Sequence, residues 1–201
     1  MCKKICIILG VLIMLLGSTQ TVYASVSLNC FYSDQNIIAK NSGRNIYSLL
    51  YDGFSASDFS DYRSNARTQW SNAGVSSSYV SRLYDSNIEL YGGKESTLSQ
   101  IDADIESYWA LTINVVNSKT GTTTYQGKTI SLYELNRVQV LCPTHLFTSP
   151  NGYKNMFTHE LGHSLGWIGH SSDSDDVMYG TAGSSRNTLT TRDKDHLKQM
   201  Y

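Results

Sequence analysis

Apolar and polar positions alternate along the first half of the chain with two different periods. Residues three or four positions apart in SDFSDYRSNARTQW fall on one face of a predicted helix that ends near Gly74: Phe59, Tyr62, Ala66 and Trp70. Segments rich in β-branched and aromatic residues predict strands: 46–51, 87–93 and 107–117. Two more extended segments, 121–136 and 137–143, follow them. Strands therefore predominate before residue 150.

The pattern then becomes helical. Met156, Phe157, Leu161 and Leu165 recur at helical spacing from Tyr153 onward, and a glycine follows them at position 166. We expect Gly166 to end this helix in a left-handed conformation.

The final segment, TTRDKDHLKQMY, predicts a short closing helix. Thr190 and Asp193 have the spacing of a capping box, and Leu197 with Met200 or Tyr201 should face inward. No repeat and no proline-rich linker divides the chain. These elements predict one α+β domain.

The first 24 residues have the pattern of a secretory signal peptide. Lys3 and Lys4 precede the apolar run Ile5–Leu16, and Ala24 ends a small-residue cleavage site. The alternative is an uncleaved anchor, although a membrane-spanning helix needs about 20 apolar residues. We therefore predict a secreted protein with a signal peptide at 1–24, an N-terminal arm or short pro-segment at 25–44 and the main domain at 45–201.

Charge and cysteine usage limit the partners. The net charge is −1 and the basic residues are scattered, so the sequence predicts no nucleic-acid binding. We also expect no membrane contact after signal cleavage, and a monomer. Only Cys30 and Cys142 remain in the mature chain, and in an exported protein we expect them to form a disulfide.

The stretch HELGHSLGWIGH, from His159 to His170, carries the strongest chemical signal. On a helix, His159 and His163 project from the same face one turn apart, so both imidazoles can reach one metal ion. Glu160 is then placed to act on a water molecule as general base. A catalytic zinc takes three protein ligands, and no glutamate follows Glu160 to supply the third.

The stretch resembles the metzincin motif HExxHxxGxxH, and with GHSSD and VMYG it is most similar to the matrixin branch. The closing segment and the early helix that reaches Trp70 are also similar to matrixins. The resemblance implies an α+β fold with a twisted mixed sheet, an active-site helix, a methionine turn and a C-terminal helix. It further implies one catalytic Zn²⁺, Met178 beneath it, and a protein or peptide as substrate.

One departure from the family pattern concerns the third ligand. Three residues, Trp167 to Gly169, separate Gly166 from His170, whereas the family has two, so Gly169 stands at the ligand position. We expect the loop to absorb the extra residue and His170 to complete a set with His159 and His163. Asp173 as third ligand, or a site too loose for catalysis, are the alternatives.

Several other residues have two interpretations each. The resemblance suggests Ca²⁺ near Asp173, Asp175 and Asp176, although a short acidic loop is usually only solvated. Tyr179 could stabilise an oxyanion or simply pack.

Two lone histidines and one cysteine also have predicted roles. His145 and His196 are predicted to be structural or exposed, and Cys30 could cap the zinc as a thiolate instead of forming a disulfide.

Two functions follow from these predictions. The first is a secreted zinc metallopeptidase in which Glu160 activates water. The second is an exported, non-catalytic binding protein that keeps a metzincin-like fold and a structural zinc.

Overall fold

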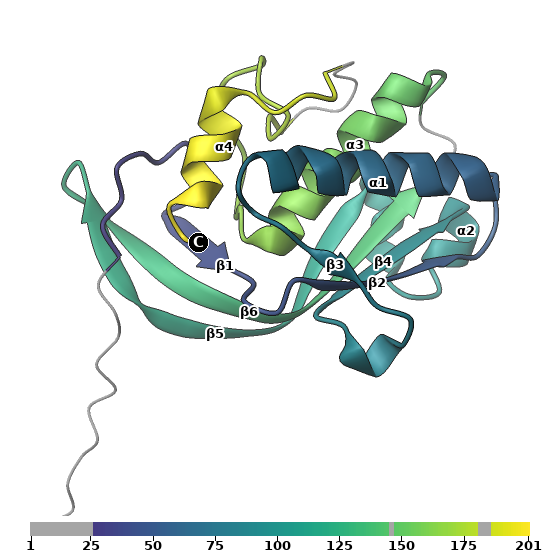
Figure 1. Ribbon diagram of the computed structural model, residues 1–201, viewed down its shortest axis with the longest axis horizontal. Helices are drawn as coiled ribbons and strands as arrows, with labels where there is room; N and C mark the ends of the chain where they lie inside the picture. Colours follow the sequence, from purple (N-terminus) through teal and green to yellow (C-terminus); the bar gives the residue numbers. More distant parts are fainter. Residues whose placement is uncertain (1–25, 145–146, 181–185) are drawn as a thin grey trace, which may run out of the picture.

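The computed structural model describes residues 26–144, 147–180 and 186–201, and its centre is a twisted six-stranded sheet (Figure 1). The strands are β1 (Ile37–Lys40), β2 (Asn45–Leu50), β3 (Ser78–Tyr79), β4 (Ile88–Gly93), β5 (Leu111–Tyr125) and β6 (Lys128–Pro143). Five run parallel in the order β1-β6-β4-β2-β3, and β5 pairs antiparallel with β6. The long strand β6 therefore connects all parts of the sheet.

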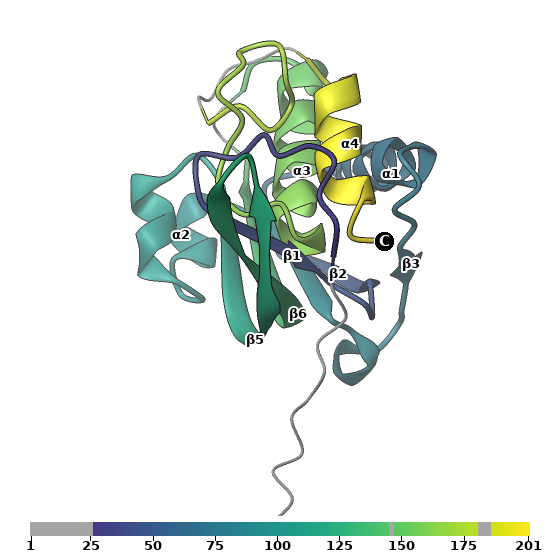
Figure 2. The same ribbon diagram turned by 90° about the vertical axis from the view of Figure 1, so that its left-hand side faces the viewer.

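Two long helices cover one face of this sheet side by side, as Figures 1 and 2 show. They are α1 (Ala56–Asn72) and α3 (Pro150–Leu165). The short helix α4 (Thr191–Lys198) lies on the same side, above the β5–β6 hairpin. Helix α2 (Glu95–Leu98) and the 3₁₀ turns Leu83–Asp85 and Ala103–Ser107 connect the remaining strands.

Polar caps explain where the three longer helices begin. Ser55 accepts a hydrogen bond from Asp58 N at the start of α1, and Ser149 accepts one from Gly152 N at the start of α3. Thr190 and Asp193 form the predicted capping box of α4. Each cap provides an acceptor for a backbone N–H that the helix itself cannot pair.

Gly166 ends α3 as predicted, with φ of 126°. A Cβ atom at this position would lie 2.2 Å from the carbonyl oxygen of Ala39. Gly166 O in turn accepts a hydrogen bond from Ala39 N at 3.0 Å. The glycine is therefore required both by the backbone conformation and by the close approach of β1.

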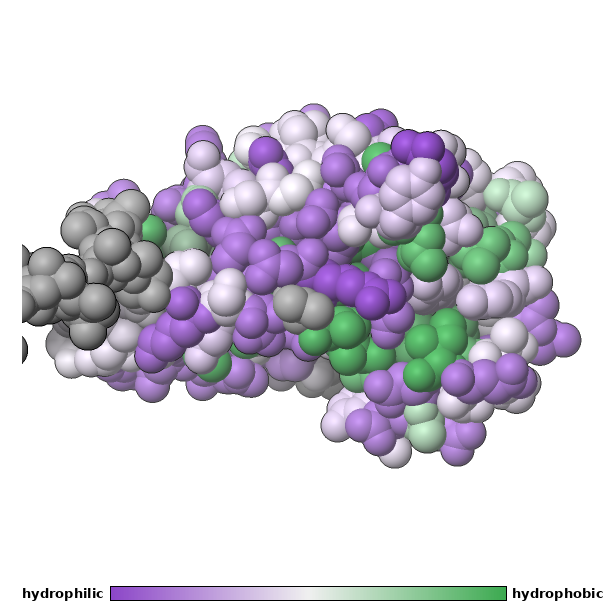
Figure 3. All heavy atoms as spheres, turned by 90° about the horizontal axis from the view of Figure 1, so that it is seen from below, coloured by the Kyte–Doolittle hydropathy of each residue, from purple (hydrophilic) through white to green (hydrophobic). Residues whose placement is uncertain are grey.

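Side chains of the central strands alternate between two apolar layers. Leu90 and Val140 belong to the main core beneath α1 and α3, whereas Tyr91 and Leu141 pack with Leu98 of α2 in a second cluster. Figure 3 views the molecule from below and shows apolar side chains gathered in one region of the surface. With apolar layers on both faces, β4 is buried along its whole length.

The segment predicted to be an N-terminal arm or short pro-segment contains a strand. Residues 37–40 form β1, which pairs in parallel with β6. Ile38 is fully buried in a third apolar cluster with Leu28, Ile130 and Leu132. The apolar run 37–39 is too short to show the period of a strand in the sequence. Pairing with a strand about 90 residues away makes this segment a strand. The hairpin of β5 and β6 also differs from the predicted bounds, because its turn falls inside the segment 121–136 and the predicted strand 107–117 continues to Tyr125 as β5.

The predicted disulfide between Cys30 and Cys142 is wrong, because both thiols are free. The Cys30 thiol lies beside the end of α4, where it approaches Oε1 of Gln199 at 3.7 Å. Cys142 is fully buried in β6 within the main core, and burial raises the pKa of its thiol well above the usual value. The two residues pack against different parts of the fold.

The predicted signal peptide at 1–24 lies outside the described residues. None of the helices in the described ranges has the length and apolar character needed to cross a membrane.

His196 of α4 is a structural histidine, as the sequence predicted. Its ring is fully buried, its Nδ1 accepts a hydrogen bond from Tyr32 N at 3.1 Å, and its centroid lies 3.9 Å from that of Trp167. Burial lowers the pKa of His196 from 6.5 to about 3. The folded protein therefore keeps this ring neutral.

The neutral ring predicts a loss of stability in acid. The unfolded chain protonates His196 below pH 6.5, whereas the folded chain does so only near pH 3, so the loss grows as the pH falls between these values. The slope is at most about 1.4 kcal/mol per pH unit. His196→Asn, which keeps an acceptor but does not titrate, should show a shallower loss in urea titrations between pH 6.5 and 4. Equal slopes in both proteins would contradict this account, because all other histidines are the same.

Candidate metal centre

Three histidines gather where α3 ends. His159 and His163 project from α3, and His170 comes from the loop that follows it. One potential ligand atom from each side chain lies within 4.8 Å of those of the other two, and the Nε2 atoms of His159 and His163 are 3.0 Å apart. In the described part of the chain this is the one group of acidic, thiol or imidazole side chains with a metal-binding arrangement.

Backbone carbonyls fix the orientation of the two helical rings. Nδ1 of His159 lies 2.7 Å from Val177 O, and Nδ1 of His163 lies 2.6 Å from Trp167 O. Because a carbonyl oxygen can only accept, each Nδ1 carries the proton and each Nε2 keeps a lone pair. Burial lowers the pKa of both rings, that of His163 to about 4, so both are neutral at physiological pH.

These groups fit a zinc ion in their chemistry. Two nitrogen ligands at Zn–N distances of about 2.0–2.1 Å in tetrahedral geometry are about 3.3 Å apart. The observed separation of 3.0 Å between His159 and His163 is close to this value. Neutral imidazoles with a hydrogen bond at the opposite nitrogen are typical zinc ligands.

The longer loop brings His170 to the helical pair. Gly169 has φ of 79°, a conformation that a glycine adopts without strain, and its backbone turns His170 toward α3. The ring of His170 lies 5.4 Å from that of His159 and 5.1 Å from that of His163, centroid to centroid. Burial lowers the pKa of His170 against the opposing effect of Asp34.

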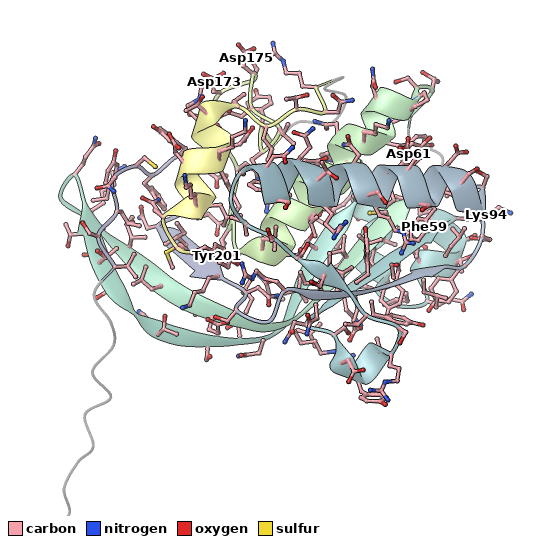
Figure 4. All side chains as sticks on the ribbon, in the orientation of Figure 1. Phe59, Asp61, Lys94, Asp173, Asp175 and Tyr201 are labelled. Carbon is pink, nitrogen blue, oxygen red and sulfur yellow. The ribbon has the colours of Figure 1, made fainter. Side chains whose placement is uncertain are left out.

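Asp173, the alternative third ligand, is engaged elsewhere. Its Oδ2 pairs with Arg192 at 2.6 Å, and its Oδ1 accepts a hydrogen bond from Asp175 N. Asp175 pairs with Arg186 at 2.5 Å, and the buried Asp176 binds Arg192 at 3.1 Å. Figure 4 shows Asp173 and Asp175 together on the loop above α4. Arginine side chains thus pair with all three of these carboxylates.

Glu160 is buried beside the three histidines. Its Oε2 accepts a hydrogen bond from the hydroxyl of Thr112 on β5 at 2.5 Å. Burial raises the pKa of Glu160 to about 7, and the bond from Thr112 opposes this shift. A carboxylate whose pKa lies near neutrality can both accept and release a proton.

Glu160 and the histidines line a cleft of about 440 Å³. One wall is the start of β5 with the residues just before it, 108–112, and the other is the loop 168–170. Gln35 of the N-terminal segment also lines it. A smaller cavity of about 220 Å³ shares Asn114 and Ile168 with the cleft. The cleft leaves room beside the histidines for a bound molecule.

The methionine turn lies under the histidines. Met178 is fully buried, and a Cβ atom on Gly162 would lie 2.5 Å from its sulfur and 2.6 Å from the ring of Trp70. Gly162 is therefore the residue that lets Met178 approach α3 between the two histidine positions. Asp193 of α4 accepts hydrogen bonds from the backbone N–H groups of Val177 and Met178.

Sequence reasoning missed three residues with contacts in or beneath this site: Asp34, Thr112 and Asp193. The capping position of Asp193 was predicted, but its contact with the methionine turn was not. None of them has a pattern in its local sequence that identifies its partner. Other predicted residues lie apart. Cys30 does not belong to the histidine group, and His145 lies outside the described residues.

Comparison with known proteins agrees with this geometry. A family model described as matrixin matches residues 83–201, more than half of the chain. The chain belongs to the matrixin family. The match covers α3, the loop to His170, the methionine turn and α4. No curated protein matches the chain.

Family membership confirms the predicted fold class. The mixed, twisted sheet, the helix with the histidines, the methionine turn and the closing helix are those expected of a matrixin. The family supports a zinc metallopeptidase in general terms.

The geometry predicts that His170, and not Asp173, completes the metal site. His170→Ala should lower the zinc content of the purified protein from one ion per chain toward none, because two imidazoles bind zinc weakly. Asp173→Ala should keep one zinc, since its carboxylate pairs with Arg192. Elemental analysis of both variants after dialysis makes the comparison. Retention of zinc by His170→Ala would refute the assignment.

Proposed function

We propose that this matrixin is a secreted zinc-dependent endopeptidase in which His159, His163 and His170 hold the metal and Glu160 is the general base. The observation that carries the proposal is the buried Glu160 carboxylate at the three-histidine group, within one cleft. Zinc, when bound, supplies Lewis acidity that lowers the pKa of a water molecule and polarises a carbonyl oxygen.

Glu160 performs the proton transfers of this mechanism. Its carboxylate takes a proton from the attacking water and later delivers it to the amine of the leaving peptide. Thr112 holds one carboxylate oxygen, Oε2, so that the side chain keeps one orientation in the cleft. The raised pKa makes Glu160 a stronger base than an ordinary carboxylate, and a pKa of about 7 still lets it release the proton to the leaving amine.

The start of β5 supports a peptide substrate. Leu111, Thr112 and Asn114 line the cleft, and this part of β5 pairs with β6 on one side only among the described strands. The other edge of β5 can pair with an extended peptide backbone, the usual way in which a chain adds to a sheet. Such pairing would place a scissile peptide bond beside the histidines.

The alternative, a non-catalytic binding protein with a structural zinc, fits the site less well. A structural zinc is closed by four protein ligands, and the described group contains three. Burying a carboxylate costs free energy, and a structural zinc would give the buried Glu160 no role that explains this cost. An open position beside a carboxylate favours hydrolysis.

Secretion is part of the proposal and rests on residues 1–24 alone. We expect the exported chain to begin at Ser25, and sequencing the N-terminus of the protein from culture medium tests this. A chain that keeps its first residues and stays with the membrane would instead support the hypothesis of an uncleaved membrane anchor.

Glu160→Gln should abolish peptidase activity while zinc stays bound. The amide keeps the size of the side chain but cannot accept a proton, and loss of general-base catalysis typically costs 10² to 10⁴ in rate, roughly. Hydrolysis of a fluorogenic peptide library, with zinc content measured in parallel, makes the test. Glu106→Gln, at an exposed position, is the matched control. Full activity of Glu160→Gln would refute the role of Glu160 as base.

A further inference from the structure

The N-terminal segment holds the backbone of the third histidine directly. His170 N donates to Oδ1 of Asp34 at 2.8 Å, and Asp34 N donates to His170 O at 2.9 Å. These two bonds close a ring between residues separated by 136 positions in the sequence. Both groups on the backbone of His170 are therefore paired with one residue.

The same segment contacts the rest of the longer loop. The Ser33 hydroxyl donates to Ile168 O. A Cβ atom on Gly169 would lie 2.1 Å from Oδ1 of Asp34 and 2.6 Å from the Ser33 hydroxyl oxygen. The loop and residues 33–34 are therefore fitted to each other, and Gly169 permits the close approach.

His170 differs in this respect from the two helical histidines. Carbonyl oxygens of Val177 and Trp167 fix the rings of His159 and His163, and the helix itself fixes their backbones. His170 lies on a loop, and its Nδ1 faces Oδ2 of Asp34 at 3.9 Å, which is too long for a hydrogen bond. The position of its backbone, set by Asp34, therefore decides where its ring lies.

We propose that Asp34 is a positioning residue for the third zinc ligand, so that residues 33–34 are a working part of the metal centre and not a removable pro-segment. The inference rests on the proposed zinc site. The extra residue before His170 lengthens the loop, and a longer loop has more conformations from which the ligand geometry must be selected. The bonds to Asp34 select one of them.

The charge of Asp34 is the smaller contribution. Its side chain is 55% exposed, so solvent screens its attraction to the imidazole. The hydrogen bond from His170 N carries the effect, and an asparagine at position 34 can accept the same bond through its own Oδ1. Comparing alanine with asparagine at position 34 therefore separates a positioning role from an electrostatic one.

Zinc affinity of the full exported chain tests the proposal. Asp34→Ala should bind zinc about tenfold more weakly than the parent in competition with a fluorescent chelator, the loss expected when one hydrogen bond that positions the ligand is removed. Asp34→Asn should recover most of the affinity. Asp85→Ala is the control. Asp85 is partly exposed, as Asp34 is, but it pairs with an arginine, so this variant should bind zinc as the parent does.

Two further readouts separate positioning from a general loss of stability. The visible spectrum of the cobalt-substituted protein reports ligand geometry and should change in Asp34→Ala but not in Asp85→Ala. Thermal unfolding of the metal-free proteins should be nearly the same for the parent and Asp34→Ala. A large drop in metal-free stability together with an unchanged cobalt spectrum would show a merely structural role and overturn the proposal.

The remaining outcomes are also decisive. If the parent binds no zinc, the proposed function itself fails. If the parent binds zinc and Asp34→Ala binds it equally well, only the inference about Asp34 fails. Should Asp34→Ala not fold, Gly169→Ala tests the same contact from the loop side, because its Cβ would displace Asp34. Parent-like zinc affinity of Gly169→Ala would then overturn the proposal.

Discussion

Helix α3 buries polar side chains, and the need to pair each of them organises the rest of the structure. A buried polar group without a partner costs about 1–3 kcal/mol. His159, Glu160 and Asn155 are almost fully buried, and each finds its partner in a different segment: Val177 O, the Thr112 hydroxyl and Arg186 O. The helix therefore specifies the positions of the methionine turn, the edge strand and the segment before α4.

Buried carboxylates in the C-terminal part of the chain also need partners. Asp176 binds Arg192 and the hydroxyls of Ser171 and Thr190, which holds the pKa of Asp176 below its usual value despite its burial. Asp193 caps α4 and binds the backbone of the methionine turn at the same time. Helix α4 thus supports the backbone of Met178, whose side chain packs against α3. The capping box is at once a local helix signal and a long-range support of the site.

The metal centre combines a rigid part with one that depends on distant residues. His159 and His163 are one turn apart on α3, so their geometry follows from the helix itself. His170 lies on a loop that is longer than the family pattern, and contacts from residues 33–34 hold it. Family membership supports zinc chemistry in general, whereas the N-terminal contacts belong to the described structure of this chain.

Features whose physical cause lies within a few residues could be predicted from the sequence alone. The HExxH spacing and the face of α1 that carries Phe59 and Trp70 follow from helical periodicity. The glycine that ends α3 and the capping box of α4 are local signals of helix ends. Long-range packing is the reason that residues 37–40 form a strand, that Cys30 and Cys142 stay apart, and that Thr112 and Asp34 contact the site. These contacts join residues separated by about 50 to 140 positions, and the local sequence around a residue does not identify a contact partner at such a distance. The packing of the whole chain around α3 provides that information.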